Sequence, residues 1–71
     1  SRHVQASAGQ PALQQAAAAM LKNELTTAHA LLEAHLARAP TDVPAMRMLA
    51  EVAMRGTRYE EADKWLRRCL E

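Results

Sequence analysis

Residues 59–70, YEEADKWLRRCL, repeat the apolar pattern of residues 25–36, LTTAHALLEAHL, at a spacing of 34 positions. Within each stretch the shared positions recur mostly three or four residues apart, which is the spacing of one face of an α-helix. The matched pairs are Leu25 and Tyr59, Ala28 and Ala62, Leu32 and Leu66, His35 and Cys69, and Leu36 and Leu70. We therefore expect two helices that occupy equivalent places in a repeated unit.

A further helix is predicted ahead of each of these two. Apolar residues recur there at positions i, i+3, i+4 and i+7: Leu13, Ala16, Ala17 and Met20, then Met46, Leu49, Ala50 and Ala53. Residues 22–24 interrupt the first pattern, Pro40 ends the helix that follows, and Gly56 is placed as a C-terminal stop. Residues 41–42 offer an N-cap for the third helix.

The sequence thus predicts an all-α fold of antiparallel helix-turn-helix hairpins with four helices. Ala and Leu dominate the hydrophobic residues, Phe and Ile are missing, and the few Val and Thr residues supply strands poorly. The first hairpin is expected over about 11–39 and the second over about 43–70, with helices at 25–39 and 59–70. Residues 1–10 are interpreted as a flexible leader.

Over Pro11–Glu71 the chain resembles the tetratricopeptide repeat (TPR) family, whose unit is a helix-turn-helix of 34 residues. The resemblance lies in Met46-Arg47-Met48-Leu49-Ala50, in Tyr59-Glu60-Glu61-Ala62, and in Leu66, Cys69 and Pro40 at the family's later apolar, small and proline positions. It implies about two repeats of a right-handed solenoid. Ala28, Ala50 and Ala62 are then expected where helices cross closely, and Met46, Leu49, Tyr59 and Leu66 are expected to fill the space around them.

The first unit departs from this pattern. Its first helix matches the third best at an offset of 33, which implies a turn one residue short or a rotated helix. At an offset of 34, Gln15 falls where a Leu belongs, and His35 stands where the family has a small side chain.

The resemblance also implies a function. In the TPR family the first helix of each unit lines a groove that binds a protein or peptide ligand. By position, the partner-binding groove would contain Arg47, Glu51, Met54 and Arg55, facing Gln14, Ala18, Leu21 and Lys22. The leading hypothesis is a protein-protein interaction module.

A second hypothesis belongs to another class of protein. The stretch from Ala28 to Leu70 also looks like the helical arm of bacterial sulfotransferase-type proteins that carry TPR units. The chain would then be the N-terminal helical segment of a larger enzyme, whose nucleotide-binding loop would lie beyond Glu71. Further 34-residue repeats in the parent protein would favour a scaffold, and a downstream phosphate loop would favour the enzyme.

No catalytic, cofactor or metal site is predicted within the segment itself. His29 and His35 lie about 120° apart around a helix, so they cannot share an ion. His35 is interpreted as an interior histidine and Cys69 as a packing residue. The acids of residues 60–63 lie at the start of a helix and Arg67 and Arg68 lie at its end, an order of charges that the helix dipole favours. These acids are therefore interpreted as helix-stabilising charges rather than as acid–base catalysts.

Charge and end effects suggest the remaining expectations. Nine Lys and Arg face eight Asp and Glu without a basic cluster, and no apolar run reaches membrane length, so neither nucleic acid nor membrane is an expected partner. The single cysteine fits a reducing, cytoplasmic compartment. With nothing after the last helix to cover them, four residues are expected to form a self-association face and make the chain a homodimer: Trp65, Leu66, Cys69 and Leu70.

Overall fold

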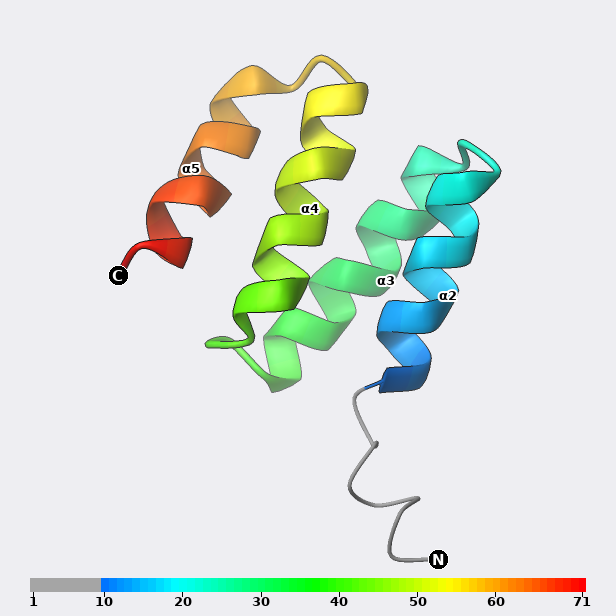
Figure 1. Cartoon of the computed structure of the whole chain (residues 1–71), viewed down its shortest axis with the longest axis horizontal. Helices are drawn as coiled ribbons and strands as arrows, with labels where there is room; N and C mark the ends of the chain where they lie inside the picture. The colour runs from blue at the N-terminus through cyan, green and yellow to red at the C-terminus, as the bar shows by residue number, and fades with distance from the viewer. Residues whose placement is uncertain (1–9) are drawn as a thin grey trace, which may run out of the picture.

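The computed structural model describes residues 10–71, and this part of the chain contains four α-helices and no strand. They are α2 (Gln10–Leu21), α3 (Leu25–Arg38), α4 (Val43–Arg55) and α5 (Tyr59–Cys69) (Figure 1). The predicted all-α class is confirmed, and the predicted helix ends lie within one residue of the observed ones wherever a residue number was given. Residues 1–9 of the expected leader lie outside the described residues. Its last residue, Gln10, is the first residue of α2.

Consecutive helices pack against each other as antiparallel neighbours, α2 on α3, α3 on α4 and α4 on α5, while α2 also touches α4. The array measures 40 × 30 × 15 Å, so it is a thin slab about one to two helices deep. Two hairpins, α2–α3 and α4–α5, therefore meet mainly where α3 lies against α4.

One aspartate fixes the start of the second hairpin. Asp42 is the N-cap of α4, where its Oδ1 accepts a hydrogen bond from the backbone N–H of Ala45 at 3.3 Å. Its Oδ2 lies 2.6 Å from Nε2 of His35 near the end of α3. His35 is only 4% exposed, which confirms that it is an interior histidine with a polar partner. A single carboxylate thus both begins α4 and ties it to α3.

The turns inside the two hairpins have the same backbone geometry. Glu24 N–H bonds to the Ala19 carbonyl and Arg58 N–H to the Ala53 carbonyl, the 6→1 bonds of a Schellman motif. The left-handed residues of these motifs are Asn23 and Thr57, both with φ of 61°. The two turns are therefore equally long and 34 residues apart. The alternative in which the first turn is one residue short is wrong.

Gly56 is the C-cap of α4, as expected, but its φ is −88°. The left-handed position that most favours glycine is taken by Thr57, a β-branched residue for which this conformation is unfavourable. The position of this turn that most favours glycine is therefore residue 57, whereas the glycine of the sequence is residue 56.

The core is a continuous cluster in which alanine supplies much of the helix contact. The predicted stripes of α3 and α4 are confirmed: Ala28, Leu32, His35, Leu36, Met46, Leu49, Ala50 and Ala53 are all buried. In α2, Ala17 is exposed and Ala19 is buried instead. Since the turn is of normal length, α2 is rotated in its unit, so that Ala16, Ala19 and Met20 face the core.

The buried face of α5 differs from the predicted one. Ala62 is buried as expected, but Tyr59 and Leu66 are exposed and do not fill the core. Trp65, which was expected on a free face, is only 8% exposed and belongs to the core cluster. Its large indole fills the space that Tyr59 and Leu66 leave, one residue around the helix from the predicted stripe.

The burial of Ala62 at 1% exposure leaves no room for a larger side chain. We expect Ala62→Leu to lower the free energy of unfolding by about 1–3 kcal/mol through overpacking. Ala34→Leu makes the same change at an exposed site on α3 and should stay within about 0.5 kcal/mol of the parent. Urea denaturation followed by helical circular dichroism measures both, and equal effects would contradict close packing at Ala62.

The backbone conformations predict that residue 56 tolerates a side chain and that residue 57 would be more stable as glycine, although the chain has Gly at 56 and Thr at 57. Thr57→Gly should raise the free energy of unfolding by about 1 kcal/mol, because it relieves an unfavourable left-handed residue. Gly56→Ala should be neutral or stabilising by up to about 1 kcal/mol. An added Cβ there meets its nearest neighbour, the Val52 carbonyl oxygen, at an ordinary 3.5 Å. Thermal melts would contradict the turn geometry if Gly56→Ala proved the more harmful change.

Candidate functional site

The predicted partner-binding residues lie on the outer faces of α2 and α4. Leu21 at the end of α2 is 89% exposed and Met54 near the end of α4 is 50% exposed. Arg47 and Glu51 are exposed on the same face of α4. The structure therefore places these four residues and Arg55 on two touching helices and leaves two large apolar side chains in solvent.

Arg55 joins the two helices rather than standing free. Its Nη1 donates to the backbone carbonyl of Met20 at 3.0 Å, and its Nη2 lies 2.6 Å from Oε2 of Glu51. The guanidinium thus satisfies a C-terminal carbonyl of α2 and pairs along α4. Within residues 10–71, Lys22 and Arg47 take part in no ion pair, so this part of the chain leaves two positive charges on the face without an acidic partner.

Four surface hollows lie between or beside α3, α4 and α5, and the predicted groove residues line none of these four. Small-molecule sites are concave and enclose most of their ligand, whereas protein partners cover broad surfaces around a few exposed apolar residues. Recognition across the α2/α4 face would therefore depend on its exposed side chains rather than on these four hollows.

The predicted self-association face is only partly free. Trp65 is covered by its own chain, and Lys64 Nζ and Arg68 Cζ lie 4.8 and 5.0 Å from the centre of its ring. Leu70 is 88% exposed, Leu66 is half exposed, and Cys69 is partly buried. The indole is thus already buried within the chain and is not an uncovered dimer contact. Homodimer formation through the remaining apolar residues stays a prediction.

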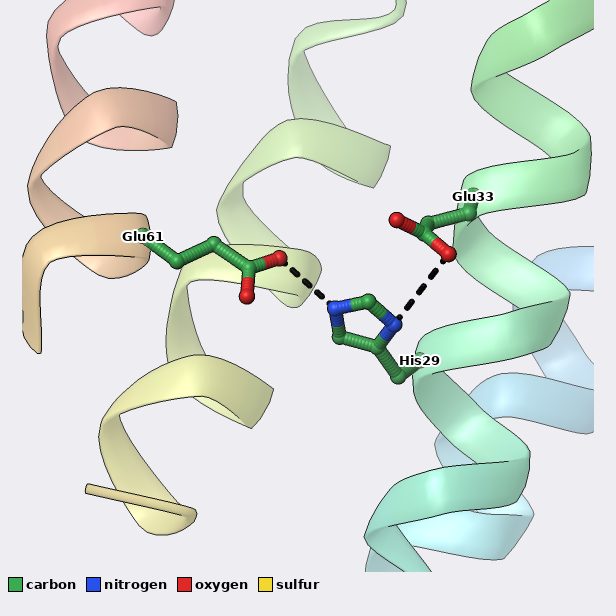
Figure 2. Close-up of side chains that lie close together, drawn as sticks. All are labelled: His29, Glu33 and Glu61. Atoms are coloured by element: carbon green, nitrogen blue, oxygen red, sulfur yellow. Dashed lines mark hydrogen bonds and ion pairs between the residues drawn. The ribbon is translucent and has the colours of Figure 1, made fainter. Parts of the chain in front are cut away.

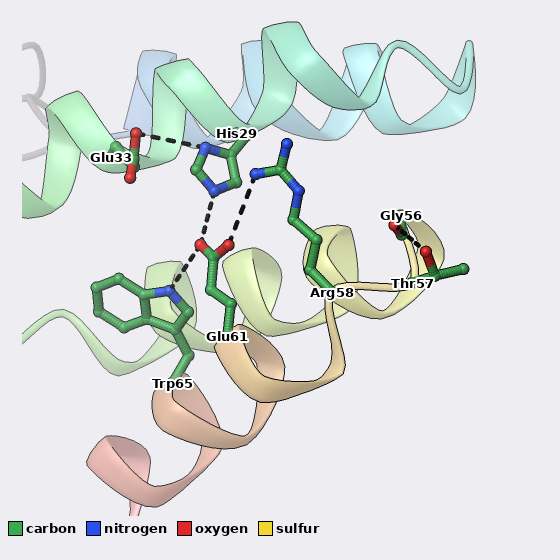
Figure 3. A network of polar contacts seen from close by, with 7 residues as sticks. All are labelled: His29, Glu33, Gly56, Thr57, Arg58, Glu61 and Trp65. Atoms are coloured by element: carbon green, nitrogen blue, oxygen red, sulfur yellow. Dashed lines mark hydrogen bonds and ion pairs between the residues drawn. The ribbon is translucent and has the colours of Figure 1, made fainter.

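A polar network between α3 and α5 links the two hairpins (Figure 3). His29 projects from α3 between two carboxylates: its Nε2 lies 2.6 Å from Glu61 Oε2 and its Nδ1 lies 3.3 Å from Glu33 Oε1. The indole N–H of Trp65 donates to Glu61 Oε2 at 3.3 Å, and Arg58 Nη1 lies 3.7 Å from Glu61 Oε1. Since both ring nitrogens face acceptors, the arrangement is fully satisfied when the imidazole is protonated.

Glu61 is the centre of this network. Partial burial acts to raise its pKa, but hydrogen bonds from His29 and Trp65 and the positive charges of His29 and Arg58 outweigh it. The pKa of Glu61 therefore lies below its ordinary value of 4.5. The side chains of His29 and Glu61 are 17% and 22% exposed, so water screens this contact less than a surface ion pair.

Sequence reasoning missed this cluster. It placed Glu61 among solvated acids at a helix start, and it weighed His29 only against His35. The spacing of His29 and Glu33, four residues apart on one helix, was a readable signal for half of the cluster. Glu61 lies 32 residues from His29 in the sequence, and the two meet only because the second hairpin packs against the first. No local sequence pattern indicates the angle at which the hairpins pack. Asp63 and Arg67, four residues apart on α5, form an ion pair at 2.7 Å.

Comparisons with known proteins add no identification. No protein-family model matches the sequence, and neither the curated proteins nor the solved structures give a significant match. Among the described residues, every helix is too short or too polar to cross a bilayer.

The lowered pKa of Glu61 predicts a loss of stability in acid. The unfolded chain takes up the proton near the ordinary value and the folded chain only at lower pH. The stabilisation is therefore complete above about pH 5 and disappears as pH falls through the folded pKa. Wild-type protein should lose melting temperature more steeply between about pH 5 and pH 3 than Glu61→Gln does.

Glu60→Gln is the matched control, because it removes the same charge from an exposed neighbour. Its melting temperature should follow the wild-type slope across this pH range. Parallel curves for wild type and Glu61→Gln would contradict a lowered pKa of Glu61 in the folded chain.

Proposed function

We propose that this chain is a protein-protein interaction module of the tetratricopeptide repeat type that binds its partner across α2 and α4. Two hairpins with equal turns 34 residues apart, and alanines buried at the helix contacts, support a repeat of that kind. The single thiol, Cys69, is in keeping with a cytoplasmic setting.

The observation that carries the proposal is the pair of exposed apolar side chains on touching helices. Leu21 is the last residue of α2 and Met54 the second-last residue of α4, and their side chains are 89% and 50% exposed. A contiguous exposed apolar patch with a polar rim marks an interaction surface, and Leu21 and Met54 are the large apolar side chains that α2 and α4 leave exposed. Methionine also adapts its shape to different partners.

The charges indicate the chemistry of the ligand. Glu51 is already paired with Arg55, whereas Lys22 and Arg47 have no acidic partner among residues 10–71. A segment that combines acidic and apolar side chains would complement this surface. We therefore propose a peptide or protein segment of that composition as the ligand.

A peptide-display selection against the whole chain tests this function. We expect the selected peptides to be rich in Asp, Glu and large apolar residues. Arg47→Glu and Met54→Asp should each weaken their binding about fivefold or more. Isotope-labelled protein should show the largest amide shifts in α2 and α4 when a selected peptide is added.

Arg38→Glu is the charge-matched control, because Arg38 is exposed at the end of α3, away from this face. It should bind the same peptides as the parent does. Peptides that ignored Arg47→Glu and Met54→Asp, or that shifted amides of α3 and α5 instead, would overturn the assignment of the binding face.

A further inference from the structure

Three potential metal ligands from two different hairpins converge at the polar network (Figure 2). His29 and Glu33 lie one turn apart on α3, and Glu61 reaches toward them from α5. One ligand atom from each of the three lies within 4.8 Å of the other two. We propose that His29, Glu33 and Glu61 bind a divalent transition-metal ion of the Zn²⁺ and Co²⁺ class.

The donor set selects this class of ion. An imidazole nitrogen suits Zn²⁺ and Co²⁺, whereas Ca²⁺ and Mg²⁺ are held almost entirely by oxygen ligands. Two carboxylates balance the charge of a divalent cation. Three protein ligands leave the fourth position of a tetrahedral ion for water.

The positions of the ligand atoms allow an ion with small side-chain movements. Nε2 of His29 and Oε2 of Glu61 are 2.6 Å apart, with a hydrogen between them. An ion in place of that hydrogen needs ligand atoms roughly 3.3 Å apart, as two bonds of about 2.0–2.1 Å in a tetrahedron require. Glu33 is 57% exposed, so its carboxylate is free to turn from Nδ1 toward the same ion.

Solvent can reach the cluster. A hollow of about 360 Å³ runs between α3 and α4 and includes His29, Glu33 and Arg58 in its wall. It offers a route for the ion and space for a water molecule as a further ligand. Arg58 lies 3.7 Å from the other oxygen of Glu61 and is largely exposed, so it competes with the ion by charge without filling the site.

An ion here would join two helices whose backbones do not approach closely. Among the described residues, α3 and α5 have no close backbone contact, and His29 with Glu61 is their polar link. Metal binding would replace one hydrogen bond by coordination bonds between the hairpins. It would therefore raise the thermal stability of the whole chain.

Titration of the 71-residue chain with Co²⁺, followed by visible absorption, tests the site directly, and melting with Zn²⁺ tests the link between hairpins. We expect the wild type to gain the d–d bands of low-coordinate Co²⁺ and to melt at higher temperature with Zn²⁺. His29→Gln keeps an amide that can hydrogen-bond to Glu61 but should lose both signals. Glu33→Gln and Glu61→Gln should each weaken binding about tenfold or more.

Two further variants separate coordination from general charge and stability effects. Glu60→Gln removes a neighbouring exposed carboxylate and should bind like the wild type. Arg58→Gln removes the competing cation and should tighten binding roughly threefold, the effect of one screened charge a few ångströms away. Circular dichroism of each variant without metal establishes that it is folded.

The proposal is overturned if folded wild-type protein gives neither signal at millimolar ion. It is also overturned if His29→Gln keeps both signals, because the ion would then be bound elsewhere, or if Glu60→Gln weakens binding as much as Glu61→Gln does.

Discussion

The close approach of helices through alanine is the constraint on which this fold depends. Ala28, Ala50 and Ala62 are buried almost completely at helix contacts, and no aromatic residue except Trp65 contributes to the core. Each helix has 11–14 residues, a length at which an isolated helix is marginal in water. The helices therefore persist because their small faces pack, and the polar contacts between hairpins form on a frame that this packing sets.

Most of the secondary structure could be predicted because its signals are local. Proline, N-cap and turn residues fix where α3, α4 and α5 begin or end, and apolar spacing identified the buried faces of α3 and α4. The faces of α2 and α5 were harder to predict. Alanine is compatible with both burial and exposure, so Ala17 and Ala19 could not be distinguished by type. In α5, the larger side chain of Trp65 is buried in the core, whereas the neighbouring Leu66 is half exposed.

The candidate sites also differ in how far the sequence alone could predict them. The exposed residues of α2 and α4 were named from their positions in the resemblance to the tetratricopeptide repeat family, which assigns a face to each helix. The cluster of His29, Glu33 and Glu61 was half visible as a pair on one helix. Its third member depends on how one hairpin is tilted against the other, which is a property of the assembled core. Polar residues that meet between repeats are thus the part of such a chain that single-sequence reasoning finds last.

The two histidine–carboxylate contacts of α3 lie at different heights along the same joint. His35 holds Asp42 at the start of α4, and His29 holds Glu61 in the first turn of α5, six residues away along the helix. The packing of α3 on α4 already fixes how the two hairpins meet. The two contacts add polar restraints at separate points along α3, one to the start of α4 and one to α5. A shift of the second hairpin along or across α3 would therefore have to break a histidine–carboxylate contact as well as disturb the core.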